Sequence, residues 1–249
     1  MSIITRRNVI VSGGGLLLAG CDRIVASPTV KQVLSLGEKA TRTAQRAVTD
    51  RNALAQEFSR ADISPVFKEN GTKRPQGDAY AAHVANGFAD WRLVVNGLVA
   101  QPMALSLADL RAAPSRTQIT RHDCVEGWSA IGEWSGVPLG LMLRRAGVSA
   151  RARYIVFHCA DTLFGKPYYE SIDMIDAFHP QTILAHSLNG QPIGIGHGAP
   201  LRLRVERQLG YKQAKYVMQV EAVESLNSLH GGKGGFWEDR SGYQWYAGI

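Results

Sequence analysis

The chain has 249 residues, a composition typical of globular proteins and a formal net charge of +7. This length can bury a sizeable core, and one compact domain is expected to hold most of it. The basic residues are scattered and no nucleic-acid recognition motif accompanies them, so no nucleic-acid partner is expected and most of the excess charge is attributed to a solvated surface.

Residues 1–29 are predicted to be an export signal. Arg6 and Arg7 form a twin-arginine pair ahead of the apolar run 9–19, which is shorter than the roughly 20 residues of a membrane-spanning helix. Residues 18–21 (Leu-Ala-Gly-Cys) resemble a bacterial lipobox, which predicts cleavage before Cys21, lipidation of its sulfur and a lipid anchor as the only membrane attachment. Plain secretion with cleavage near residues 26–27 is the alternative. The twin-arginine route carries folded proteins, so the expected location is the periplasm or the outer face of the cytoplasmic membrane.

Residues 30–63 are predicted to form an amphipathic helix and spacer. Apolar residues recur at intervals of three and four from Val30 to Phe58, and Ser64-Pro65 would end the helix. This segment could dock a partner beside the lipid anchor, or it could pack on the following domain as an extra layer.

Residues 64–249 are predicted to form one α+β domain with a mixed β-sheet. Strand patterns occur at 92–95, 116–124, 154–159, 182–186, 201–205 and 216–223, with turns at Asn96-Gly97 and Asn189-Gly190. Residues 106–109 resemble a capping box that opens a short helix, and a second helix is expected between Pro138 and Gly147. Because strands and helices do not alternate regularly, a doubly wound Rossmann sheet is not expected.

Cys124 is the main candidate for chemistry. It is one of three cysteines, and it follows an alternating strand among Arg121, His122 and Glu126. A thiolate at such a place suits a metal ligand or a nucleophile. The ordinary alternative is a small buried hydrophobic residue, the commonest fate of a free cysteine.

Residues 121–129 (Arg-His-Asp-Cys-Val-Glu-Gly-Trp-Ser) resemble the molybdenum-ligating segment of the sulfite oxidase-like molybdopterin-dependent oxidoreductases. The likeness is closest to the bacterial branch that contains the catalytic subunit of periplasmic methionine-sulfoxide reductase. It runs from about Asn70 to Ile249 and implies a sulfite oxidase-type cofactor domain. It also implies one molybdenum–molybdopterin per chain, with Cys124 as the protein ligand of the metal. A soft thiolate suits such a metal.

Further motifs follow in the order of that family. Residues 67–71 (Phe-Lys-Glu-Asn-Gly) resemble Phe-x-x-Asn-His, residues 197–202 (His-Gly-Ala-Pro-Leu-Arg) resemble Asn-Gly-Ala-Pro-x-Arg, and residues 210–215 (Gly-Tyr-Lys-Gln-Ala-Lys) resemble Gly-Phe-Lys-Gly-Ile-Lys. Cys159 stands where the family strand ends in a cofactor-contacting Thr. The resemblance therefore implies a cofactor-binding set of Asn70, Cys124, Cys159, His197, Arg202, Gln213, Ala214 and Lys215.

The same resemblance implies two-electron oxygen-atom transfer, with Arg121, His122, Glu126 and Trp128 as candidates for the substrate pocket. Residues 125–128 (Val-Glu-Gly-Trp) stand where sulfite oxidases carry Ala-Gly-Asn-Arg, and a carboxylate there would repel sulfite. Reduction of a sulfoxide-type substrate, small or protein-bound, is therefore favoured over sulfite oxidation. The expected electron partner is a cytochrome or a membrane haem subunit. A monomer is expected, since the immunoglobulin-like dimer domain of longer relatives is not part of this sequence.

Two other classes of function stay open. The chain could be a cysteine hydrolase, with Cys124 as the nucleophile and His122 on the same strand face as its base, or a binding lipoprotein without chemistry. Zinc is not expected, because no second Cys or His lies at ligand spacing from Cys124.

The glycine-rich segment 231–235 lacks the context of a phosphate loop and is expected to be flexible. An aromatic tail, 243–246, would follow it and pack on the domain, and Trp237 could rim the active site.

Overall fold

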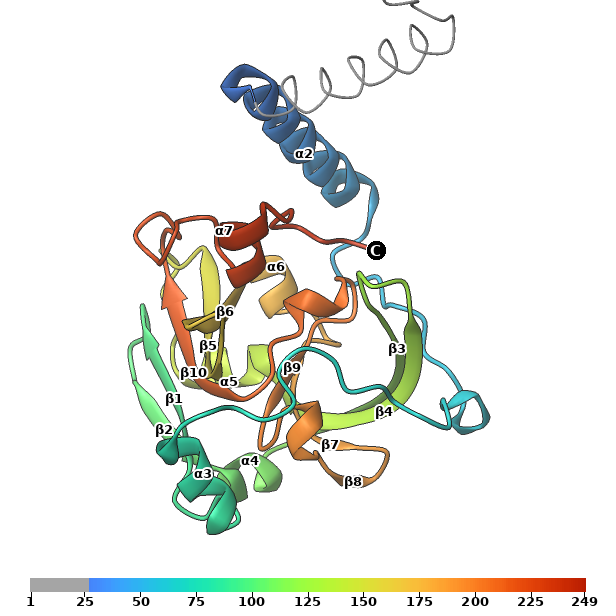
Figure 1. The fold of residues 1–249 in the computed structure, drawn as a ribbon, viewed down its shortest axis with the longest axis vertical. Helices are drawn as coiled ribbons and strands as arrows, with labels where there is room; N and C mark the ends of the chain where they lie inside the picture. Colours follow the sequence, from blue (N-terminus) through green and yellow to red (C-terminus); the bar gives the residue numbers. More distant parts are fainter. Residues whose placement is uncertain (1–26) are drawn as a thin grey trace, which may run out of the picture. The chain divides into compact units, whose positions relative to one another are not determined.

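The computed structural model describes residues 27–249, which form two compact units that divide between Asp50 and Arg51. The described part of the first unit is helix α2 (Pro28–Val48), drawn in blue in Figure 1, with a proline in its first turn. The predicted leader, with its arginine pair and Cys21, lies outside the described residues. Within the described part, none of the helices has the length and apolar character needed to cross a membrane.

The amphipathic helix is shorter than the sequence pattern predicts. It ends at Val48 rather than at Phe58, so the predicted boundary between 63 and 64 falls instead at Asp50. Glu57 forms an isolated β-bridge with Thr120, and Phe58 N–H donates to the carbonyl oxygen of Ile119 at 2.9 Å. The apolar residues after Asp50 therefore belong to an extended segment on a sheet edge, where their spacing only imitates a helical period.

The second unit is α+β, as predicted, and contains two five-stranded sheets (Figure 1). The first sheet has the order β2-β1-β10-β5-β6, in which β1 and β10 pair in parallel and every other pair is antiparallel. Its strands are β1 (Arg92–Gly97), β2 (Met103–Ser106), β5 (Tyr154–Leu163), β6 (Lys166–Asp173) and β10 (Val217–Val223). The mixed pairing excludes a doubly wound architecture.

The second sheet is antiparallel and carries the segment around Cys124. Its order is β3-β4-β7-β8, with β9 also paired to β7. The strands are β3 (Arg116–Asp123), β4 (Ser129–Pro138), β7 (Ile183–Leu188), β8 (Gln191–Pro192) and β9 (Arg202–Arg204). Asn189 and Gly190 join β7 to β8 with φ values of 51° and 74°, and positive φ at both positions is what a two-residue type I′ hairpin requires.

Short helices and turns connect these strands. At α4 (Leu107–Ala112) the Ser106 hydroxyl accepts from Asp109 N–H while the Asp109 carboxylate accepts from Ser106 N–H, which confirms the predicted capping box. Helix α5 (Leu139–Arg145) follows Pro138, and Gly147 ends it with a φ of 65°. The remaining elements are α3 (Asp78–Ala85), α6 (Met174–Ala177), α7 (Phe236–Ser241) and the 3-10 turns Arg60–Asp62, Ile195–His197 and Gly210–Lys212.

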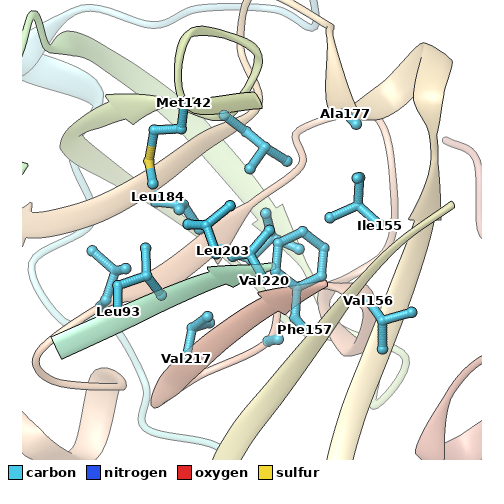
Figure 2. Close-up of a cluster of buried hydrophobic side chains, with 14 of the residues drawn as sticks. Leu93, Met142, Ile155, Val156, Phe157, Ala177, Leu184, Leu203, Val217 and Val220 are labelled. Atoms are coloured by element: carbon cyan, nitrogen blue, oxygen red, sulfur yellow. The ribbon is translucent and has the colours of Figure 1, made fainter. Parts of the chain in front are cut away.

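The main core lies between the two sheets and is shown in Figure 2. Leu93, Phe157 and Val220 come from the first sheet, and Leu184 and Leu203 from the second. A smaller cluster around Trp134 and Phe67 covers the other face of the second sheet. Neighbours on β7 divide between the clusters, since Leu184 joins the first while Ile183 and Ala185 join the second. Both faces of this sheet are therefore buried, and it can hold side chains rigidly on either side.

Replacing Gly136 by Ala should destabilise the second unit, because β4 and β7 approach closely there. A Cβ at Gly136 would lie 2.1 Å from Leu184 O and 2.5 Å from Ala185 Cα. We expect Gly136→Ala to lower the free energy of unfolding by about 1–3 kcal/mol, measured by denaturant titration. Gly194 has an ordinary φ of −73° and only one atom, at 3.8 Å, near its added Cβ. Gly194→Ala should stay within about 0.5 kcal/mol of the parent, and equal losses from the two variants would contradict the argument.

Candidate active site

Cys124 lies at the tip of the hairpin between β3 and β4. Its N–H donates to Trp128 O at 3.0 Å, and its carbonyl accepts from Gly127 N–H at 3.0 Å. Gly127 has a φ of 84°, a conformation that glycine adopts without strain. The Ser129 hydroxyl ties the two sides of the hairpin together by donating to Asp123 Oδ1 at 2.5 Å. The short turn therefore presents a half-buried sulfur in a fixed position.

The sulfur of Cys124 has one hydrogen-bond donor among the described residues. Asn70 Nδ2 donates to Cys124 Sγ at 3.2 Å, across 54 positions of sequence. An amide donor stabilises electron density on the sulfur, which a metal-bound thiolate needs. No described contact joins Cys124 to His122, so the residues present do not form the nucleophile–base pair that a cysteine hydrolase requires.

Cys124 opens into a cavity of about 200 Å³. Most of the predicted site residues line it together: Asn70, His122, Cys124, Glu126, Trp128, Arg202, Gln213 and Lys215. Four do not. Arg121 is exposed and pairs with Asp123 at 2.9 Å, and Cys159, His197 and Ala214 are not part of the lining.

Arg202 contributes a buried cation to the wall. Its guanidinium stands 5.2 Å from the ring centre of Trp134, and Nη1 donates to the carbonyl oxygen of His197 at 3.2 Å. Its Nε is buried without a hydrogen-bond partner among the described residues. Burial, and next the neighbouring Arg204, lower the pKa of Arg202. An anion in the cavity would offset both effects, because it would restore a partner for the charge.

Lys215 contributes a second cation and ties several segments together. Its Nζ donates to the carbonyl oxygens of Asn70 at 2.7 Å and Gly196 at 2.9 Å, and to that of Thr72. Burial, and next the charge of Arg202, lower the pKa of Lys215 to about 7. The position of the Asn70 segment beside Cys124 therefore depends on this ammonium group.

Two further residues line the cavity with buried polar atoms. These atoms are Thr72 Oγ1 and Asp161 Oδ1. Burial raises the pKa of the Asp161 carboxyl. Sequence reasoning missed both residues. Asp161 follows Cys159 by two positions on β5, so the predicted strand was right but its cavity-lining residue lies further along.

The remaining predicted residues act from behind the cavity. The His197 ring packs edge-on against Phe67, with 5.8 Å between ring centres, and its backbone holds Arg202. The backbone carbonyl of Ala214 accepts from Leu203 N–H at 2.8 Å, which attaches the 210–215 segment to β9. Cys159 Sγ lies 3.9 Å from the carbonyl oxygen of Phe157. These three residues shape the wall without reaching the cavity.

The C-terminal segment closes one side of the cavity. Trp237 and Tyr243 line it with stacked rings 5.7 Å apart, so Trp237 lies at the cavity, as one of the two sequence interpretations expected. The glycine-rich stretch leads into α7, which is anchored by a buried ion triad: Lys212 Nζ lies 2.6 Å from Glu170 and 2.5 Å from Glu238. Burial alone would lower the pKa of Lys212, but the two carboxylates raise it. The triad fastens this wall to the 210–215 segment.

These features fit a large anionic group with a soft metal. The cavity offers one candidate sulfur ligand, one buried and one part-buried cation, and a guanidinium Nε that has no hydrogen-bond partner among the described residues. Pterin nitrogens and a phosphate would satisfy those polar atoms and charges, and the thiolate of Cys124 would suit molybdenum.

Comparisons with known proteins agree with this geometry. Residues 81–229 match the family described as oxidoreductase molybdopterin binding domain. A protein of Azospira oryzae, whose name assigns it to the protein-methionine-sulfoxide reductases as subunit YedZ1, is 41% identical over 95% of this chain and 83% of its own. The protein-methionine-sulfoxide reductase catalytic subunit MsrP of Xanthomonas campestris is 32% identical over 85% of this chain and 66% of its own.

A solved structure shares the fold. The sulfane dehydrogenase SoxCD from Paracoccus pantotrophus superposes with a TM-score of 0.52 at 26% sequence identity, covering 56% of this chain and 40% of that one. The chain spans only about half the length of another MsrP, from Xanthomonas axonopodis. It belongs to the family of oxidoreductases with a molybdopterin binding domain, and its cofactor is molybdenum–molybdopterin.

Proposed function

We propose that this oxidoreductase reduces sulfoxides, small or protein-bound, by two-electron oxygen-atom transfer. A sulfoxide, two electrons and two protons would give a sulfide and water. The names of the YedZ1 and MsrP relatives support this direction. The observation that carries it is the position of Glu126, whose carboxylate lines the same cavity as Cys124. That charge repels the sulfite anion and leaves a neutral sulfoxide unaffected.

Different residues of the cavity would bind the metal, bind the phosphate and position the carboxylate at the mouth. Cys124 would hold the metal through its sulfur while Asn70 stabilises charge on that sulfur. Arg202 and Lys215 would neutralise the phosphate end of the cofactor. When bound, the cofactor supplies the exchange of two electrons and of an oxygen atom. Trp128, with Nε1 donating to Glu126 at 3.1 Å, holds the carboxylate at the mouth.

Sulfite oxidation is the second candidate, and one contact favours it. Lys68 Nζ lies 3.8 Å from the Glu126 carboxylate and 5.4 Å from the centre of the Trp128 ring. This cation reduces the repulsion that an anionic substrate would meet. Both groups are more than half exposed, however, so solvent screens the pair and the net preference for a neutral substrate remains.

The cellular setting is also part of this proposal. The twin-arginine pair would export the folded, cofactor-loaded protein to the periplasm or the outer face of the cytoplasmic membrane, and a lipid on Cys21 would retain it there. The electron donor would be a cytochrome or a membrane haem subunit, and the oxidoreductase itself would be a monomer. The predicted leader in the sequence and the envelope setting that the resemblance implies support this placement.

Replacing Cys124 by Ser should abolish turnover without unfolding the protein. A hydroxyl is a poor substitute for a thiolate on a soft metal, while its size fits the half-buried turn. Turnover would be measured with methionine sulfoxide and a reduced viologen dye, and with sulfite and an electron acceptor on the same sample. Undiminished turnover in Cys124→Ser would refute the ligand role. Faster turnover of sulfite than of sulfoxide in the parent would reverse the proposed direction.

Replacing Lys215 by Met should lower the cofactor content. The change removes a charge from the wall and releases three carbonyl oxygens, so we expect cofactor affinity to fall by roughly tenfold or more. Molybdenum and released pterin per chain would be measured on purified protein, with folding checked by thermal unfolding. The exposed Lys233, changed to Met, is the matched control and should keep the parental content. A folded Lys215→Met protein with a full complement of cofactor would rule out this role.

Lipidation of Cys21 is expected to be visible in the mass of the mature protein. Protein isolated from membranes should begin at Cys21 and carry acyl chains, and Cys21→Ser should be released into the soluble envelope fraction. A mature N-terminus near residue 27 in the parent would support plain secretion instead.

A further inference from the structure

A buried chain of polar side chains lies behind His122, on the side away from the cavity. Arg204 has no exposed surface, and its Nε and Nη2 donate to the Glu206 carboxylate at 2.9 and 2.6 Å. Gln118 Nε2 donates to the same carboxylate at 2.8 Å. Arg204 Nη1 then donates to His122 Nδ1 at 3.1 Å. The ion pair is fully desolvated, and its geometry is fixed by these hydrogen bonds.

This contact determines which ring nitrogen of His122 carries a hydrogen. A guanidinium group has only donors, so Nδ1 must be the acceptor. Gln213 Oε1, at a longer 3.3 Å, would accept a hydrogen from Nδ1, but that hydrogen would then face the charged Nη1 donor of Arg204 at 3.1 Å, so the Arg204 contact prevails. An Nδ1 that accepts this hydrogen bond carries no hydrogen itself. The single ring hydrogen therefore lies on Nε2.

The Nε2 edge of the ring faces the cavity wall beside Gly210. A Cβ at Gly210 would stand 2.5 Å from Nε2, so only glycine leaves room for the ring. His122, Gly210 and Cys124 all line the same cavity. In the described part of the chain, no protein atom accepts a hydrogen bond from His122 Nε2. The structure thus holds an N–H donor, oriented by Arg204 and without an acceptor of its own among the described residues, in the cavity that Cys124 also lines.

We propose that His122 Nε2–H donates to the oxygen of the substrate, and that Arg204 and Glu206 are positioning residues that keep it in this form. The inference rests on the proposed sulfoxide reduction and adds the group that recognises the reacting oxygen. A sulfoxide oxygen is an uncharged acceptor and needs only a neutral donor. The sulfide product has lost this oxygen, and a thioether sulfur accepts weakly. The same donor therefore favours substrate over product.

The form of His122 can be measured without turnover. In oxidised holoprotein labelled with ¹⁵N-histidine, two-bond ¹⁵N–¹H spectra distinguish the two ring nitrogens, and the His122 signals are those missing in His122→Gln. We expect a bare Nδ1 and a protonated Nε2 in the parent. Arg204→Met should replace this single form by a mixture. A hydrogen on Nδ1 in the parent, or an unchanged spectrum in Arg204→Met, would overturn the positioning role.

The role of the donor can be measured by kinetics with methionine sulfoxide. His122→Phe keeps a ring but removes the donor, and we expect KM to rise about 5- to 10-fold at unchanged molybdenum content. Gln carries an amide N–H close to the position of Nε2, so His122→Gln should regain most of the loss. His186 is a buried histidine outside the cavity, and His186→Phe should keep the parental KM. Inhibition by the sulfide product should be equal in the parent and His122→Phe.

The outcomes separate this inference from the function on which it rests. If the parent reduces sulfoxides and His122→Phe does so with the parental KM, the donor role is refuted and the proposed function stands. If the parent reduces no sulfoxide, the proposed function and the substrate contact fall together. The spectra then still decide whether Arg204 fixes the ring.

Discussion

The site depends on two guanidinium groups buried beside one indole. On β9, Leu203 faces the main core, while Arg202 and Arg204 face the opposite way, with guanidinium carbons 5.2 and 4.5 Å from the ring centre of Trp134. Burying two like charges together is unfavourable unless each is compensated. Glu206 pairs with Arg204 but not with Arg202. Among the described residues, Arg202 therefore has no carboxylate in a salt bridge, and a bound anion would supply the missing negative charge.

Arg202 and Arg204 lie on β9, so the strand pairing that forms the second sheet also positions the residues of the site. β9 pairs with β7, β7 with β4, and the β3–β4 hairpin carries Cys124 at its tip. Arg204 reaches His122 near the end of β3, and the backbone of Leu203 holds the 210–215 segment. The proposed sulfur ligand and the cations proposed to bind the phosphate thus share one framework, as a site that must not reorganise during reaction requires.

Local signals in the sequence predicted local structure correctly. The Ser106 capping box and the Asn189-Gly190 turn each depend on a few adjacent residues, and both are present as predicted. β4 and β6 were not predicted, because both faces of β4 are buried and β6 places Glu170 and Ser171 in the interior, so neither strand alternates between apolar and polar residues.

For the site, too, short motifs could be predicted from the sequence, while contacts between distant segments could not. Motif resemblance predicted Cys124, Asn70, Arg202 and Lys215, which line the cavity. It could not predict Arg204 or Asp161, since the partner of Arg204 lies 82 positions away and the role of Asp161 is visible only in the shape of the cavity. In the same way, the apolar spacing of residues 51–58 carried no sign that the chain there lies against β3.

The last wall of the cavity has a consequence for biosynthesis. Trp237 and Tyr243 are translated after every other residue that lines it, and their segment is fastened by an ion triad that needs Glu238 in place. While the ribosome still holds this stretch, the basin around Cys124 stands open on that side. A cofactor that enters before this stretch folds would therefore be enclosed by it afterwards.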